Sequence, residues 1–160
     1  MTLHRTPVLA FLLAVLATVP AQARGYADAD NPSQAVGMMK MTILMSGIME
    51  KKCVARFPEQ QGQIQADLKR WRALDSAEIE TAERSWRQME QKKPGMSRDL
   101  EEAAKQGYES QLAAPARLLG KAAETKIHRD YCAQYFNELA TGVWRKQTPL
   151  VYQYLANAPK

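Results

Sequence analysis

The stretch that decides the fold runs from Asn31 to Pro58 and reads NPSQAVGMMKMTILMSGIMEKKCVARFP. It opens with the signals of a helix start: Asn31 suits the N-cap, Pro32 the first helical position, and Gln34 the third position of a capping box. It closes at Pro58, which lacks the amide hydrogen that a continuing helix needs. We therefore predict one helix from the cap at Asn31 to about Phe57.

This predicted helix is apolar over more than half of its circumference. Its charged residues are Lys40 and a cluster between Glu50 and Arg56. A helix with so wide an apolar face is usually surrounded by other elements, so we expect it at the centre of the fold. The residues of that face are Met38, Met41, Leu44, Met45, Ile48 and Met49, and Met39, Ile43 and Phe57 widen it.

The first 23 residues have the pattern of a signal peptide. His4 and Arg5 are basic, residues 8–19 form an uncharged apolar run, and Ala21-Gln-Ala23 is a small-x-small cleavage pattern. The run is shorter than the ~20 residues that span a bilayer, and no later segment is long and apolar enough to do so. We expect cleavage after Ala23 and export to the periplasm or the medium; an uncleaved N-terminal anchor is the alternative.

The rest of the chain is expected to form a flexible arm, residues 24–30, and a single domain, residues 31–160. The whole chain carries a net charge of +5. Cleavage removes Arg5 from its 22 basic residues, so 21 remain against 17 acidic ones. Because acids and bases alternate along the predicted helices, the charge indicates solvated helix faces. We expect no nucleic-acid partner, and a weak attraction to anionic envelope components stays open.

The chain contains two cysteines, Cys53 and Cys132. In an oxidising compartment we expect them to form a structural disulfide, with a free or intermolecular thiol as the alternative. The bond would close a loop of about 80 residues, worth about 4.5 kcal/mol on the chain-entropy estimate. Phe57 and Phe136 each follow a cysteine by four residues, which places a ring beside each sulfur on a helix. There is no C-x-x-C motif, which argues against a thiol–disulfide oxidoreductase.

Residues 59–93 repeat apolar positions in one helical phase, including Trp71 and Trp86, which we expect in the core. One unbroken helix would be about 50 Å long, which is awkward in a domain of this size. The sequence Asp75-Ser-Ala-Glu78 is a capping-box pattern. We therefore favour two helices, near 60–73 and 76–92, with Asp75 as the N-cap of the second; a single long helix is the alternative.

Three further segments have helical patterns. Ser97 can cap a helix that ends or kinks at Ala114-Pro115. The pattern then continues from Pro115 to Gly142, a natural C-cap, and Gly120 leaves open whether this is one helix or two. Thr148-Pro149 can begin a short helix that runs to Ala156.

Within that last segment Val151-Tyr152 would also suit a strand, but no partner strand is found. Helical periodicity with Gly and Pro punctuation predominates throughout the chain. The predicted fold is all-α: a small bundle of four to six helices with one disulfide, after a cleaved signal peptide.

Catalytic motifs are absent from the sequence. It has no Gly-rich phosphate loop, no G-x-S-x-G, no H-E-x-x-H and no C-x-x-C-H. His128 is the one histidine after the leader, and its charged neighbours, residues 126–130, predict a surface position. Asp75 is the one acid that would lie on an apolar face, if the long helix were unbroken. We expect a non-enzymatic protein without a cofactor; an enzyme with an unrecognised site is the alternative.

The methionines are the one suggestive chemical feature. Thioethers can bind Cu(I), but all four methionines of the central helix cannot reach one ion, since Met38 and Met49 lie about 16 Å apart along the axis. A copper site would combine Met41 and Met45 with Met89 or Met96. We expect these side chains to pack in the core instead, and we expect the protein to bind an envelope protein, a peptide or an apolar ligand through adaptable helix faces.

Overall fold

The computed structural model describes residues 27–113, 117–118 and 120–159. Within these ranges the chain forms seven α-helices and no strand, so the predicted all-α fold is confirmed. The expected signal peptide, residues 1–23, lies outside the described residues. No helix in the described part of the chain is both long and apolar enough to cross a membrane.

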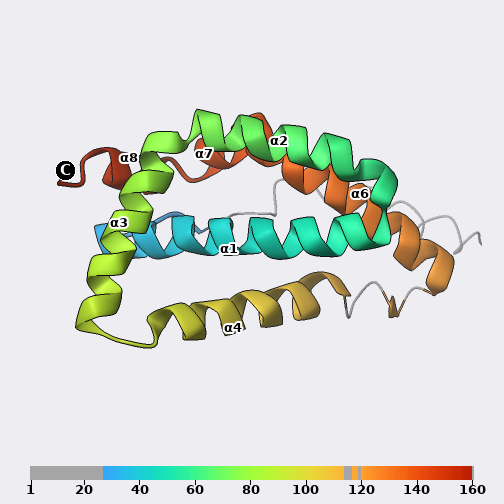
Figure 1. The fold of residues 1–160 in the computed structure, drawn as a ribbon, viewed down its shortest axis with the longest axis horizontal. Helices are drawn as coiled ribbons and strands as arrows, with labels where there is room; N and C mark the ends of the chain where they lie inside the picture. Colours follow the sequence, from blue (N-terminus) through green and yellow to red (C-terminus); the bar gives the residue numbers. More distant parts are fainter. Residues whose placement is uncertain (1–26, 114–116, 119, 160) are drawn as a thin grey trace, which may run out of the picture.

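The central element is α1 (Pro32–Arg56), as predicted. The Asn31 side chain caps it by accepting a hydrogen bond from the Gln34 amide at 2.9 Å, and the helix ends at Phe57. Helices α2, α3, α4, α6 and α8 all contact α1. Figure 1 shows α1 running through the middle of the molecule, with α2 and α6 along one side, α4 along the other, and α3 across the end at which α1 begins.

The most buried face of α1 differs from the broad methionine face. Met38, Met41 and Met45 are half-buried. The fully buried residues lie on a face that is rotated about the helix axis by roughly a third of a turn from the methionine face. Because helices surround α1, no single side of it faces all of the core. Small residues instead mark the side of closest packing. The fully buried residues are Ala35, Val36, Met39, Thr42, Ser46, Met49 and Cys53.

Residues 59–93 form two main helices, as the sequence favours, and not one long helix. A 3-10 turn, η2 (Pro58–Gln60), leads into α2 (Gln61–Leu74), and α3 (Ser76–Lys92) follows after a bend at Asp75. Trp71 and Trp86 are both buried, as expected of core residues. The bend turns α3 away from α2 and across the end of the bundle, which resolves the length problem of a continuous helix (Figure 1).

The next helix, α4 (Met96–Tyr108), starts at Gly95, whose φ of 97° is left-handed. A π-helical turn, η3 (Glu109–Ala113), extends it, and residues 114–116, where the predicted break lies, are outside the described residues. Ser97 does not act as the predicted cap. Its hydroxyl donates to Glu90 at 3.0 Å, and Glu90 itself accepts the Gly95 and Ser97 amides at 2.8 Å.

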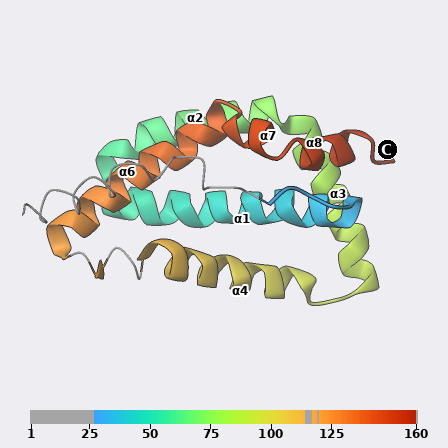
Figure 2. The same ribbon diagram turned by 180° about the vertical axis from the view of Figure 1, so that it is seen from behind.

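The C-terminal part contains α6 (Lys121–Ala140), α7 (Val143–Gln147) and α8 (Pro149–Ala156). Gly142 follows the end of α6 with a left-handed φ of 69°, as a C-cap glycine should, and the five-residue α7 was not foreseen. The strand considered for Val151-Tyr152 is excluded, because both residues are helical. Seen from behind, α6, α7 and α8 follow one another on the same side of α1 as α2, and α8 lies beside α3 (Figure 2).

The disulfide joins Cys53 of α1 to Cys132 of α6, with the two Cα atoms 5.9 Å apart. This confirms the predicted link. The rings of Phe57 and Phe136, each four residues after a cysteine, are both buried.

The end of the expected arm is packed against the bundle. The Asp28 carboxylate accepts the amides of Leu150 and Val151 at 2.9 and 3.1 Å, and Ala29 is fully buried. Residues 28–30 of the expected arm therefore contact the bundle, while residues 24–26 are outside the described residues.

Candidate functional site

A groove of about 280 Å³ opens at the end of the bundle where α1 begins. The first turn of α1, the second half of α3 and the end of α8 form its walls. Its floor is mostly apolar and includes Val36 of α1, Met89 of α3 and Leu155 of α8. We call this the α1–α3–α8 groove. Its lining residues are Pro32, Ser33, Val36, Ser85, Gln88, Met89, Lys92, Tyr154, Leu155, Asn157, Ala158 and Pro159.

Polar side chains surround the apolar floor of this groove. Ser33, Ser85, Gln88 and Asn157 can each donate or accept a hydrogen bond. Lys92 is the one charged residue among the described residues of the lining. The groove therefore combines an apolar surface with several uncharged hydrogen-bonding groups and one cation.

His128 lies in a second concave region, contrary to the prediction of a surface histidine. Only 3% of the residue is exposed, because its side of α6 faces the C-terminal turns of α1 and the end of α4. The region is a hollow of about 460 Å³, which we call the His128 hollow. Its lining residues are Lys52, Ala55, Arg56, Tyr108, Glu109, Ala113, Arg117, Glu124 and His128.

The hydrogen bond of His128 fixes its neutral tautomer. Its Nδ1 lies 3.0 Å from the backbone carbonyl oxygen of Glu124. A carbonyl oxygen only accepts, so Nδ1 carries the proton and Nε2 is left as an acceptor. Nε2 is buried and has no hydrogen-bond partner among the described residues. A smaller cavity of about 10 Å³, close to the space that one water needs, adjoins the ring and the two cysteines.

Most charges of the His128 hollow are already paired. Arg56 contacts Glu124 at 3.1 Å, and Arg117 is hydrogen-bonded to Glu109. The Lys52 ammonium lies 5.8 Å from the centre of the Tyr108 ring. Burial raises the pKa of the Tyr108 phenol, which therefore stays protonated at neutral pH. The lining residues of the hollow include one histidine and no serine, threonine or thiol nucleophile.

Comparison of the chain with protein-family models, curated proteins and solved structures gave no match. The two concave regions are therefore interpreted from their own geometry.

Asp75 occupies the N-cap position of α3, as predicted, but its side chain makes no capping hydrogen bond and forms a third polar cluster instead. Its carboxylate accepts hydrogen bonds from the Trp71 indole at 2.9 Å, the Tyr152 hydroxyl at 2.7 Å and the Arg145 guanidinium at 2.9 Å. Only 1% of Asp75 is exposed. Glu78 also contacts Arg145, at 3.1 Å. Because every carboxylate oxygen is occupied by a protein donor, this cluster binds elements together and offers no site to a ligand.

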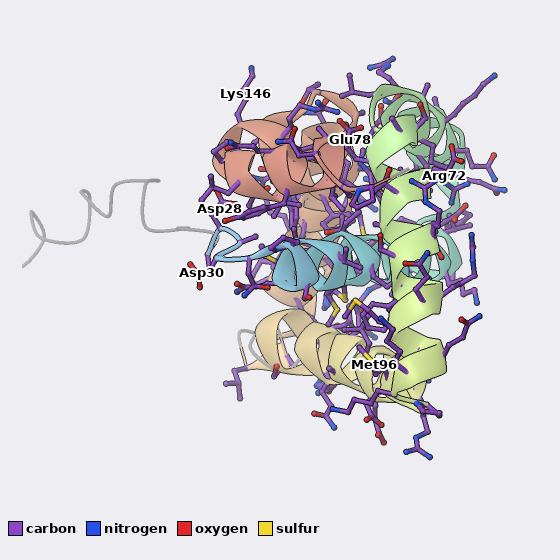
Figure 3. The ribbon with its side chains drawn as sticks, turned by 90° about the vertical axis from the view of Figure 1, so that its left-hand side faces the viewer. Asp28, Asp30, Arg72, Glu78, Met96 and Lys146 are labelled. Carbon is purple, nitrogen blue, oxygen red and sulfur yellow. A yellow bond between two sulfur atoms is a disulfide. The ribbon has the colours of Figure 1, made fainter. Side chains whose placement is uncertain are left out.

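The methionines considered for copper are distributed over three helices. Met41 and Met45 are half-buried on α1, Met89 lines the α1–α3–α8 groove, and Met96 is the first residue of α4. Figure 3 shows Met96 at the corner where α3 gives way to α4. In the described part of the chain no three His, Cys, Asp or Glu side chains gather as a metal site.

The sequence indicated neither concave region. Residues 32–36, 85–92 and 154–159 form the groove only because the bend at Asp75 carries α3 across α1 and because α8 returns to the start of α1. Two groove residues have a role in the sequence analysis, Pro32 as the first helical position of α1 and Met89 as a possible copper ligand, and neither role indicates a groove. The sequence around Met89 contains no signal for the other two walls.

Proposed function

We propose that this chain is an exported, non-enzymatic protein that binds a peptide segment in the α1–α3–α8 groove. The observation that carries the proposal is the groove itself: an apolar floor from three helices, bordered by hydrogen-bonding side chains. Its volume of about 280 Å³ is close to the lower end of typical ligand pockets, ~300 Å³. That size suits one or two apolar side chains of a longer segment better than a large enclosed ligand.

The polar side chains favour a peptide over a purely apolar ligand. A hydrocarbon chain can neither donate nor accept a hydrogen bond, so it would leave the polar side chains of the groove without partners. These side chains are Ser33, Ser85, Gln88 and Asn157. A peptide presents a backbone donor and acceptor at each residue beside its apolar side chains. Export is supported by the leader-like residues 1–23 and by the Cys53–Cys132 disulfide, since disulfides persist in oxidising compartments.

Filling the groove tests the proposal. The purified protein is used to select binders from a displayed library of random peptides, and the enriched peptides are titrated by fluorescence anisotropy. Gln88→Trp places a large ring in the groove, whereas Gln91→Trp adds the same ring to an exposed position of α3 outside the lining. We expect Gln88→Trp to weaken binding at least tenfold and Gln91→Trp to leave it unchanged. Peptides that bind both variants equally would refute the groove as the site.

An enzyme is the second candidate, because the His128 hollow brings a histidine together with Glu124 and the Tyr108 hydroxyl. A tautomer with a free Nε2 suits a general base. It ranks second because Nε2 is enclosed and the lining carries no hydroxyl or thiol nucleophile apart from the Tyr108 phenol. Wild-type protein, His128→Gln and the exposed control Lys126→Gln are compared on ester, phosphate-ester and peptide substrates. Turnover that only His128→Gln abolishes would favour the enzyme.

A further inference from the structure

A single helix, α4, lies over the methionine side of α1. The Lys52 ammonium of α1 lies 5.8 Å from the centre of the Tyr108 ring of α4. Lys52 follows Met45 by seven residues, about two helical turns, so both side chains leave α1 on the same side. Figure 3 looks along the bundle and shows sulfur atoms between α1 and α4, with Met96 at the start of α4.

The apolar side chains between the two helices form a layer that we call the α1–α4 seam. Around the axis of α1, the three methionines that it contributes lie within about 60° of one another. The residues of α4 follow one another at intervals of four and so form one stripe. The seam consists of Met38, Met41 and Met45 from α1 and of Met96, Leu100, Ala104 and Tyr108 from α4.

The methionines of the seam are less covered than the other methionines of α1. All four of them are half-buried. Met39 and Met49, which lie on the more buried side of α1, are 0% and 1% exposed. A small oxidant in solution therefore reaches the sulfurs of the seam and is kept from those of Met39 and Met49.

The attachment of α4 to α1 is almost entirely apolar. Among the described residues no hydrogen bond or ion pair joins the two helices. In contrast, α3 is joined to α1 by the Lys40–Glu83 ion pair, and α6 is joined to it by the disulfide. The start of α4 is held by Glu90, which accepts two backbone amides there. An element held along its length by few contacts is one that can open locally.

We propose that the α1–α4 seam is a redox-sensitive switch, in which oxidation of its methionines releases α4 while the rest of the bundle stays folded. Hydrogen peroxide transfers one oxygen atom to a thioether sulfur: the O–O bond breaks, an S–O bond forms, the sulfur becomes a sulfoxide and the peroxide is reduced to water. A closed seam would then bury a polar group among apolar side chains, which is unfavourable. This inference does not rest on the proposed function, because no described residue of α4 lines the groove.

Peroxide treatment of the full protein, with its disulfide intact, tests the switch. Peptide mapping by mass spectrometry should show that the methionines of the seam gain oxygen about ten times faster than Met39 and Met49. Hydrogen exchange of the oxidised protein should accelerate about tenfold in α4 and less than about threefold in α2 and α6. Unchanged exchange in α4 would overturn the switch. Equal acceleration in all helices would overturn the release of α4 as a unit, and equal oxidation rates would overturn the selectivity of the seam.

Leucine replacements separate the sulfurs of the seam from the other methionines. Leu fills nearly the same volume as Met and has no sulfur to oxidise. The combined variant Met38→Leu/Met41→Leu/Met45→Leu/Met96→Leu should lose the response of α4 to peroxide, whereas Met89→Leu, in the groove, should keep it. The single variant Met45→Leu removes one sulfur and should reduce the response, so the test does not depend on the combined variant alone. A full response in either of the two seam variants would overturn the inference.

Discussion

Asp75 shows how a single buried carboxylate can hold several helices together. It lies at the bend between α2 and α3 and binds Trp71 from α2, Arg145 from α7 and Tyr152 from α8. A buried charge is costly unless donors surround it, and here hydrogen bonds from three side chains replace the lost water. Partial burial opposes the charge on Arg145, but Asp75 outweighs it and raises the pKa of the guanidinium.

Two tyrosines on α8 allow this cluster to be tested. Tyr152 donates to Asp75 from a buried position. Burial is the larger cause and this hydrogen bond the next largest cause that raise the pKa of its phenol far above the ordinary value. Tyr154 donates to the exposed carbonyl oxygen of Asp30 at 3.2 Å. We expect Tyr152→Phe to lower the free energy of unfolding by about 1–2 kcal/mol, because it leaves a buried charge short of a donor.

Tyr154→Phe should change the free energy of unfolding by less than about 0.5 kcal/mol, because water replaces the lost donor at an exposed acceptor. Urea denaturation with the disulfide intact measures both variants. Equal losses from the two variants would contradict the role given to Asp75.

For individual residues, the sequence predicts which side chains can cap a helix better than it predicts which groups those side chains bind. Asn31 caps α1 as predicted, because its partner lies three residues away. Asp75 and Thr148 also occupy the predicted N-cap positions, of α3 and α8, but neither side chain makes a capping hydrogen bond. Ser97 lies inside α4, whose N-cap position is Gly95. Their side chains bind groups that are brought near by the fold or by the preceding turn: Ser97 binds the indole of Trp86, and the Thr148 hydroxyl donates to a carbonyl of α7. A capping pattern cannot reveal such competing partners.

The start of α8 is capped from the other end of the chain. Asp28 accepts the Leu150 and Val151 amides, which Thr148 leaves without a side-chain acceptor. Burial raises the pKa of the Asp28 carboxyl, but backbone amides outweigh burial and the net pKa falls below 3.8. The lowered pKa means that the ionised form stabilises the fold. This stabilisation is complete above the ordinary pKa and is lost as the pH falls through the lower, folded-state pKa.

Asp28→Asn should therefore destabilise the protein in a pH-dependent way. At pH 7 we expect a loss of about 1 kcal/mol, typical of a weakened helix cap. The difference from wild type should shrink below pH 3.8, where the wild-type carboxylate also becomes neutral. Asp30→Asn removes the same charge two residues away, where no described residue donates to the carboxylate, and serves as the control. A loss that is as large at pH 2.5 as at pH 7 would argue against the carboxylate as the cap.

Helix boundaries were predictable because local residues set them. Pro58 ends α1, Gly142 follows the end of α6 with a left-handed φ, and the two helices on either side of Asp75 lie within a residue or two of their predicted bounds. The closest-packed side of α1 was not predictable in the same way. It depends on which helices surround α1, and a wide apolar surface fits several arrangements of neighbours.

Different interactions stabilise the two ends of the molecule. At the end where α1 begins, Asp28 and the Asp75 cluster hold α8 and the α2–α3 bend by hydrogen bonds. At the other end the Cys53–Cys132 disulfide joins α1 to α6. The disulfide was predictable from two cysteines in a chain that is expected to be exported, whereas the groove was not, because it depends on how distant helices meet. The groove lies at the hydrogen-bonded end and does not depend directly on the disulfide.

Removing the disulfide should therefore weaken the two ends unequally. The double variant Cys53→Ala/Cys132→Ala should lose about 3–4.5 kcal/mol of unfolding free energy, since the bond spans a sequence separation of 79 residues. Hydrogen exchange should accelerate most in α6 and the C-terminal half of α1, and less in α3 and α8. A reductant should bring wild-type protein to the stability of the variant and leave the variant unchanged. Uniform acceleration along the chain would show instead that the two ends unfold as one unit, because local opening would then require global unfolding.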